Sequence, residues 1–158
     1  LWQPGWRLSG PGPGSATYIH FGAIHARSMY GDAAAISLGP DRQARVLTRK
    51  GVVLRPPEVP AIPDPPQGDR ILRPRLDRAA TEAAAHLSAA TALAYGSDRA
   101  FVAGERNGAV AVGVAELATE KRDLLQLAGV DPPIRDILYD SGGSLWLAAA
   151  SGLFELEL

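Results

Sequence analysis

The chain has 158 residues, a formal net charge of -1 and no cysteine. This length predicts one domain with a substantial core. The charge argues against a dedicated nucleic-acid-binding protein, which is usually clearly basic. The lack of cysteine excludes disulfides, cysteine-ligated zinc and iron–sulfur clusters. No apolar run reaches the roughly 18 residues that a membrane-spanning helix needs.

Fourteen of the 16 basic residues are arginine, and alanine, glycine and proline are abundant. This composition is typical of a GC-rich genome. The first residue is Leu1 rather than methionine, so we expect either a removed leader or a truncated start. The compartment is not assigned by these features; we favour a periplasmic or other extracytoplasmic location in a bacterium.

The first 75 residues predict an arm, several strands and a stiff insertion. Residues 1–15 are rich in Trp, Pro and Gly, and they predict an extended arm. Residues 56–66 hold six prolines, which predicts a polyproline-like linker within an insertion over 56–76. The β-branched and aromatic composition of three other segments predicts strands. These segments are Thr17–Ala23, Ala33–Leu38 and Ala44–Leu54, the last two joined by a turn at Gly39-Pro40-Asp41.

The second half begins with a helix signal. Asp77 is a plausible cap for an Ala- and Glu-rich helix over Asp77–Leu87. Short apolar runs over 89–117 and Ile134–Leu158 predict strands, and Thr119–Leu127 predicts one or two helical turns.

Three segments share a strand–turn–strand–turn–strand plan, over 31–55, 88–117 and 131–158. Each has a glycine directly before its third strand, at Gly51, Gly108 and Gly152. A tight hairpin needs a positive φ at this point, which glycine adopts freely. The glycines are 57 and 44 residues apart. The second interval lies within the roughly 40–50 residues of a propeller blade, and the proline-rich linker and its helix explain the longer first interval.

The strands Leu145–Ala149 and Ala109–Val114 are almost continuously apolar. Such a run predicts a strand covered on both faces, as in a blade packed between two others. A two-sheet sandwich with one wet face per sheet should alternate more strongly, and it remains the alternative.

The last segment reads Asp140-x-x-Gly143-x-Leu145-Trp146-Leu147-x-x-x-x-Gly152-Leu153. This resembles the blade motif of the two-component-regulator propellers, with Ala148 and Ala149 where that family usually has Gly and Thr. In the middle segment Phe101 stands at the Trp position, and in the first segment Arg45 does. The resemblance implies structural roles for these residues, so no catalytic residue is carried over.

The sequence therefore predicts a mainly β fold of propeller-like blades over 16–158, with one short helix in the 77–87 region. Three blades are visible, and residues 1–30 could form a degenerate fourth. Closed propellers have at least four blades. The chain is accordingly a small propeller, an open array, or part of a ring that another chain completes.

No catalytic, cofactor-binding or metal-ligating set emerges. His20 and His25 are five residues apart, so on one strand they would point to opposite faces, and His86 falls on the predicted helix. No nucleophile elbow or phosphate loop is present. Asp140-Ser-Gly-Gly lacks the further carboxylates of a calcium site and predicts a turn.

Charge and aromatic residues suggest candidate partner-binding sites. Residues 42–78 carry net +5 (nine basic, four acidic), and residues 101–158 carry net -5 (four basic, nine acidic). The basic segment either docks an acidic partner or anionic membrane surface, or neutralises the acidic segment within the fold. Trp2 and Trp6 either anchor a partner or pack on the chain itself. The candidate residues are Trp2, Trp6, Arg70, Arg73, Arg75 and Arg78.

Together these features favour a non-enzymatic binding or scaffold subunit that contacts protein partners within a larger assembly and needs no cofactor. The family resemblance implies an alternative, an extracytoplasmic sensory domain that binds a ligand. A third hypothesis is an enzyme with its site in a propeller channel.

Overall fold

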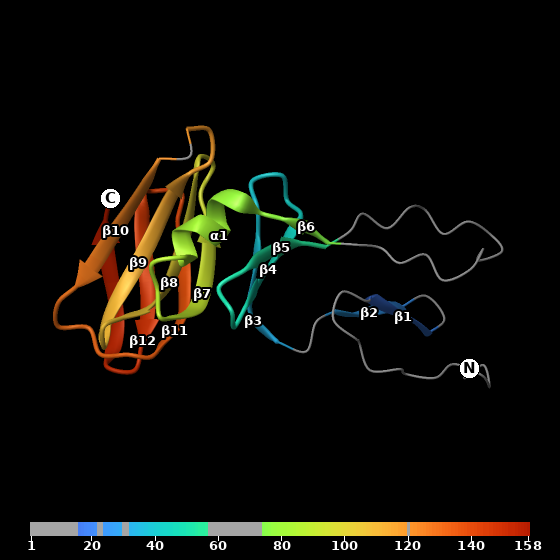
Figure 1. The fold of residues 1–158 in the computed structure, drawn as a ribbon, viewed down its shortest axis with the longest axis horizontal. Helices are drawn as coiled ribbons and strands as arrows, with labels where there is room; N and C mark the ends of the chain where they lie inside the picture. Colours follow the sequence, from blue (N-terminus) through green and yellow to red (C-terminus); the bar gives the residue numbers. More distant parts are fainter. Residues whose placement is uncertain (1–15, 22–23, 30–31, 57–73, 120) are drawn as a thin grey trace. The chain divides into compact units, whose positions relative to one another are not determined.

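The computed structural model describes residues 16–21, 24–29, 32–56, 74–119 and 121–158. The chain divides into two compact units: Leu1–Gly31 with Pro56–Arg75, and Asp32–Arg55 with Leu76–Leu158. The predicted arm over 1–15 and most of the proline-rich insertion lie outside the described residues. The ribbon in Figure 1 shows the described elements.

In the smaller unit, β1 (Ala16–Phe21) and β2 (Ile24–Met29) form an antiparallel hairpin. The strand predicted over Thr17–Ala23 thus ends at Phe21. The expectation that His20 and His25 lie on one strand was wrong, because the chain reverses direction between them. The register of the hairpin places His20 directly opposite His25.

The larger unit begins with a four-stranded antiparallel sheet, which we call the first sheet. Its strand order is β3 (Ala33–Leu38), β4 (Ala44–Thr48), β5 (Val53–Arg55) and β6 (Arg75–Leu76). The single strand expected over Ala44–Leu54 is divided by a tight turn. At this turn Gly51 has a φ of 75°, and its amide donates to the Thr48 carbonyl at 3.0 Å.

Helix α1 (Arg78–Ala84) follows β6, and the Asp77 side chain caps it as predicted by accepting from the Ala80 amide. The second sheet has the strand order β10-β9-β8-β7. Its strands are β7 (Ala89–Tyr95), β8 (Arg99–Arg106), β9 (Ala109–Glu116) and β10 (Arg122–Leu127). At the predicted hairpin, Asn107 and Gly108 have φ values of 53° and 77°. The helical turns expected over Thr119–Leu127 were wrong, because Arg122–Leu127 pairs with β9 as a strand.

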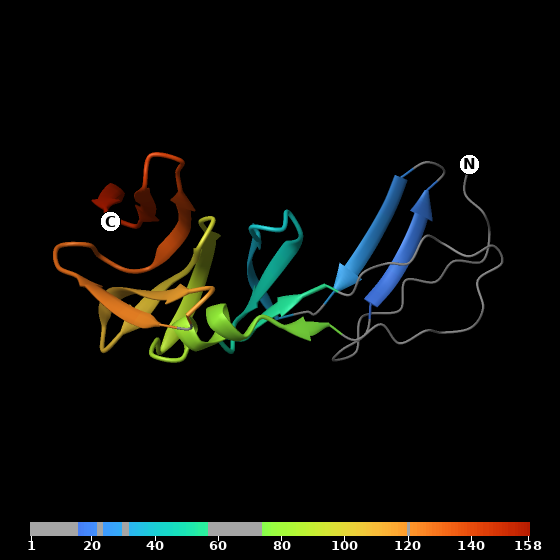
Figure 2. The same ribbon diagram turned by 90° about the horizontal axis from the view of Figure 1, so that it is seen from above.

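The third sheet has the order β11 (Ile134–Tyr139), β12 (Ser144–Ala149) and β13 (Gly152–Glu157), close to the predicted strands. All three sheets are antiparallel and blade-like, and the described chain is mainly β with one short helix. Their first strands are neighbours, since β3 and β11 both lie against β7. Figure 2 shows the same succession of sheets from a second direction.

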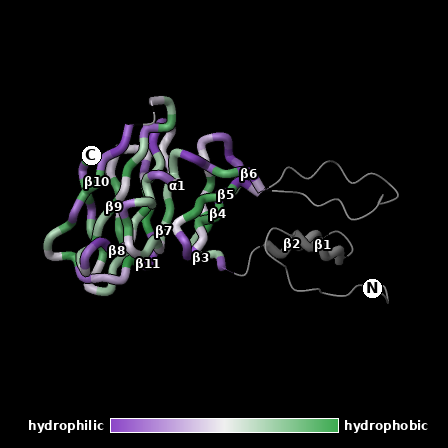
Figure 3. The backbone as a smooth tube through the Cα atoms, viewed as in Figure 1, coloured by the Kyte–Doolittle hydropathy of each residue, from purple (hydrophilic) through white to green (hydrophobic). Residues whose placement is uncertain are grey.

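Two apolar clusters flank the second sheet. On one face, Phe101, Val110 and Val112 pack with Leu145 and Leu147 of the third sheet. On the other face, Val102 and Ala115 share a cluster with residues of the first sheet and α1. These residues are Leu47, Val53, Ala80, Ala83 and Ala84. Figure 3 shows the hydrophobic residues running through the strands of the second sheet. The continuous apolar run of β9 is therefore covered on both faces, as the sequence predicts.

Candidate interaction surfaces

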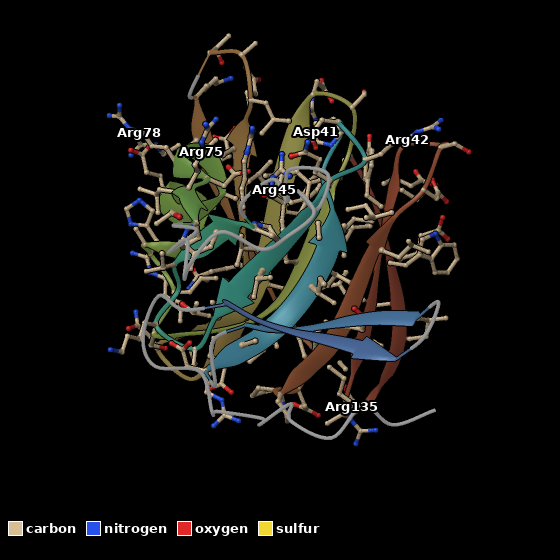
Figure 4. The ribbon with its side chains drawn as sticks, turned by 90° about the vertical axis from the view of Figure 1, so that its right-hand side faces the viewer. Asp41, Arg42, Arg45, Arg75, Arg78 and Arg135 are labelled. Atoms are coloured by element: carbon tan, nitrogen blue, oxygen red, sulfur yellow. The ribbon has the colours of Figure 1, made fainter. Side chains whose placement is uncertain are left out.

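The predicted partner-binding residues are not assembled into one described site. Trp2, Trp6, Arg70 and Arg73 lie outside the described residues. Arg75 lies in β6 and is exposed. Arg78 begins α1 and pairs with Glu82 at 2.9 Å while its side chain stays 68% exposed. Figure 4 labels these two arginines together with Arg42, Arg45 and Arg135.

A buried polar network joins the first sheet to the second. Arg45 of β4 is almost fully buried, and its Nε donates to Asp77 Oδ2 at 2.9 Å. The Tyr95 hydroxyl at the end of β7 donates to the same oxygen at 3.1 Å. The other oxygen, Asp77 Oδ1, accepts from the Ala80 amide at 3.3 Å. One carboxylate therefore connects a strand of each sheet to the start of the helix.

The guanidinium of Arg45 is further held from the β3–β4 turn. Its Nη2 donates to Asp41 Oδ2 at 2.8 Å, and its Nη1 donates to the Gln43 carbonyl at 3.1 Å. Figure 4 shows Asp41 beside Arg45 at this end of the strand. The Arg45 Cζ also lies 5.9 Å from the centroid of the Tyr95 ring, within the range of a cation–π contact.

Three members of the network, Tyr95, Arg45 and Asp41, have shifted pKa values. Burial, and then the neighbouring Asp77 charge, raise the pKa of Tyr95 far above its usual range. Burial lowers the pKa of Arg45, but the hydrogen bonds that it donates to Asp41 and Asp77, together with their charges, outweigh burial and leave that pKa raised. The Arg45 hydrogen bond lowers the pKa of Asp41. The arrangement thus keeps one cation between two carboxylates and a neutral phenol, which suits a structural joint.

A second joint, between the second and third sheets, is aromatic. The Phe101 ring of β8 stacks on the Tyr139 ring at the end of β11, with centroids 4.8 Å apart and an interplanar angle of 27°. The two joints correspond in strand register. Tyr95 pairs with Ala100, the residue before Phe101, and Tyr139 pairs with Leu145, the residue before Trp146. In the first sheet, Leu38 pairs with Ala44, the residue before Arg45.

The turn before Trp146 is built around one carboxylate. Asp140 Oδ1 accepts from the amides of Gly142 at 2.8 Å and Ser144 at 3.0 Å. Its Oδ2 accepts from the Trp146 indole Nε1 at 2.9 Å. The Trp146 bond, followed by that of Ser144, lowers the pKa of Asp140. In the last segment, the Asp140 carboxylate therefore shapes the turn and orients the Trp146 indole.

The outer face of the third sheet carries apolar side chains on all its strands. We call Leu138, Trp146, Ala148 and Leu153 the C-face. Leu138 pairs with Trp146 across β11 and β12, and Ala148 pairs with Leu153 across β12 and β13, so the four are neighbours on one face. Leu138 is 63% exposed and Leu153 is 68% exposed. The apolar run of β12 predicts cover on both faces, whereas its burial alternates and only the inner face is buried.

A corresponding outer face belongs to the first sheet. We call Ile36, Leu38, Val46 and Leu54 the N-face, because the pairs Ile36–Val46 and Val46–Leu54 put them on the side opposite Leu47. Ile36 is 71% exposed and Leu38 is 64% exposed, while Val46 is buried. Large exposed apolar side chains gathered on a sheet face are typical of interaction surfaces.

Sequence reasoning missed both the buried network and these faces. Asp77 was identified only as a helix cap, and its partner Arg45 is 32 residues away. The one available signal in the sequence was the alignment of Arg45 and Phe101 with Trp146. Each of these residues directly follows the residue that pairs with the end of the first strand of its sheet.

Three comparisons complete this description. No family model, no curated protein and no solved structure matches the chain. Within the described residues, no group of three or more His, Asp or Glu side chains could hold a metal ion. In that same part of the chain, no helix is long and apolar enough to cross a membrane.

Proposed function

We propose that this chain is a non-enzymatic scaffold subunit that binds protein partners through the outer faces of its first and last blade-like sheets. The observation that carries the proposal is the exposure of Ile36 and Leu38 on the N-face and of Leu138 and Leu153 on the C-face. Isolated exposed leucines are ordinary, but neighbours gathered on one sheet face indicate an interface.

The contacts among the three sheets of the larger unit support the same function. In the second sheet, both faces are buried against neighbours. The buried ionisable groups Arg45 and Asp77 are bonded to one another, as are the turn residues Asp140 and Trp146. These polar groups hold sheets and turns in place. In the described part of the larger unit, the two end sheets offer a partner an apolar and charged surface.

The resemblance to the two-component-regulator propellers belongs to this proposal. Its Asp, Trp and closing Gly have structural parts here: Asp140 bonds the Trp146 indole, and Gly152 has a φ of 146° at the β12–β13 turn. Blade-like sheets stack face on face. An end sheet with an apolar outer face is therefore suited to receive another sheet.

A test places a photo-cross-linking amino acid at one position at a time in the source cells. Leu138 and Ile36 probe the two faces, and the exposed Gln126 of β10 and Ala118 are controls. We expect discrete adducts from the face positions and none from the controls. A free chain of 16.6 kDa with no adduct at either face would overturn the proposal.

A further inference from the structure

We infer that a second copy of this chain occupies the two faces head to tail, with the C-face of each copy packed on the N-face of the other. This inference rests on the proposed function and names its partner. Its basis is that the two joints within the chain share one plan of contacts. The outer faces of the first and third sheets carry the two sets of side chains that a further joint of this plan needs.

Each internal joint has the same plan. The second strand of one sheet presents a side chain, Arg45 or Phe101, to the residue that ends the first strand of the next sheet, Tyr95 or Tyr139. Trp146 occupies the presenting position in the third sheet, since its predecessor Leu145 pairs with the end of β11. Among the described residues of the larger unit, no further sheet follows the third to receive it.

The receiving position is also free at the other end. Leu38 ends β3, and it pairs with the residue before Arg45, as Tyr95 and Tyr139 pair with the residues before Phe101 and Trp146. Leu38 is 64% exposed. A joint of the same plan between two copies brings Trp146 of one against Leu38 of the other and removes both apolar side chains from water.

The charges of the two end sheets are complementary. Residues 32–55 carry five basic and two acidic side chains, net +3. Residues 131–158 carry one basic and five acidic side chains, net -4. On the outer face of the third sheet, Glu155 pairs across the sheet with Trp146 and Glu157 pairs with Ser144, and both glutamates are exposed. Arg45 and Arg55 already pair with Asp41 and Asp77 within the chain, so the exposed Arg42, Arg49 and Lys50 are the basic side chains of residues 32–55 that can meet these glutamates.

Two copies suffice for closure. The described residues of the larger unit form three blade-like sheets, and three from each copy make six, within the four to eight blades of closed propellers. A head-to-tail contact closes into a ring when its rotation allows, and otherwise extends into a filament. A ring of two copies buries both faces of both chains, which leaves no apolar end sheet open to solvent.

The purified full chain should sediment at twice its 16.6 kDa mass. We expect Leu138→Arg and Ile36→Glu, each alone, to raise the dissociation constant at least about 100-fold, because each buries a charge in an apolar contact. Gln126→Arg, on an exposed position of β10, should remain a dimer. Since both face residues are exposed in one copy, the far-ultraviolet circular dichroism of these variants should match that of the wild type.

Mixing the two face variants separates a head-to-tail contact from other dimers. The Leu138→Arg copy keeps its N-face and the Ile36→Glu copy keeps its C-face, so one intact joint can form only between unlike copies. The mixture should therefore yield a heterodimer although neither variant dimerises alone. A symmetric contact of C-face on C-face predicts no such recovery.

Because the chain has no cysteine, an engineered pair can report the contact directly. Leu38→Cys in one copy and Ala148→Cys in a second, larger tagged copy should be joined by a short bismaleimide linker. Gln126→Cys with Ala148→Cys is the matched control and should give no product.

A monomeric wild type, or a dimer that neither face variant weakens, overturns the second-copy inference. Its failure is distinguishable from failure of the proposed function. A purified monomer whose Leu138 position cross-links to a different protein in cells leaves the scaffold function standing and rules out the second copy. A monomer without cross-links at either face rules out both.

Discussion

At the scale of single residues, Asp77 combines three structural roles. It caps α1, it accepts from Arg45, and it accepts from Tyr95. Its side chain and that of Arg45 are 8% and 1% exposed. A buried ion pair adds little when both members are present, but removing one member leaves the other buried without its countercharge.

Asp77→Asn should therefore lower the free energy of unfolding by about 3 kcal/mol, since the amide can still cap the helix but cannot neutralise Arg45. Urea unfolding followed by fluorescence measures this. Asp98→Asn is the matched control: its side chain is 66% exposed, 3.7 Å from Arg99, and the change should cost less than about 0.5 kcal/mol. Equal losses from the two variants would show that Asp41 alone satisfies Arg45.

At the scale of elements, the seven-residue helix α1 depends on the sheet beneath it, because an isolated helix of this length is unstable in water. It lies on β8 and β9 and buries Ala80, Ala83 and Ala84. Gly113 of β9 makes this approach possible. A Cβ at Gly113 would stand 2.0 Å from the Ala83 carbonyl oxygen, a backbone atom that can move only with the helix.

Gly113→Ala should thus displace α1 and cost about 2–3 kcal/mol of unfolding free energy, as overpacked sites do. Hydrogen exchange should show faster exchange of the α1 amides than in the wild type. Gly108→Ala separates crowding from backbone strain. Its φ is 77° and nothing lies within 4 Å of the added Cβ, so it should cost about 1 kcal/mol and leave α1 protected. Unchanged α1 exchange in Gly113→Ala would contradict this account.

The elements also show where sequence reasoning works and where it fails. The turn glycines Gly51 and Gly108 were found because a positive φ restricts residue choice locally. The strand β10 was mistaken for helical turns, because a run such as Asp123-Leu124-Leu125-Gln126-Leu127 has good helix propensity. Pairing with β9 and packing of Leu125 and Leu127 against the core decide its structure instead. Such tertiary contacts are not encoded within the segment.

At the scale of the whole larger unit, the second sheet is the common support of its neighbours. Adjacent residues of β8 serve opposite joints: Phe101 packs in the cluster shared with the third sheet, and Val102 packs in the cluster shared with the first sheet and α1. Both are fully buried. The stability of each neighbouring sheet is therefore linked to a different face of the same strand.

Phe101→Ala should cost about 3–5 kcal/mol, and Val102→Ala should cost about half as much because a smaller side chain is lost. Native-state hydrogen exchange should report different places of loosening. We expect Phe101→Ala to release β11 and β12 first, and Val102→Ala to release α1 and β4 first. Each variant is the control for the other. The same pattern of exchange in both would mean that the sheets unfold as one unit.

The candidate surfaces were only partly predictable at this scale. The continuous apolar sequence of β12 correctly predicted a strand, but the prediction that both its faces are covered was wrong, because only the inner face is buried. The arginine cluster proposed as a docking patch was inferred from nearness in sequence. Of its members, Arg70 and Arg73 lie outside the described residues, Arg75 is exposed on β6, and Arg78 pairs along its own helix with Glu82. Direction and pairing depend on the fold, which composition does not contain.

The two tyrosines that end β7 and β11 have a consequence for how such a chain can change over evolution. A tyrosine ring face accepts a guanidinium, as Tyr95 accepts Arg45, and it accepts another ring, as Tyr139 accepts Phe101. A sheet whose first strand ends in this tyrosine can therefore pack on a preceding sheet that presents either an arginine or an aromatic side chain. Gene duplication or loss of one whole sheet would then leave each new junction workable without simultaneous compensating mutations, so sheet number can drift while the joints persist.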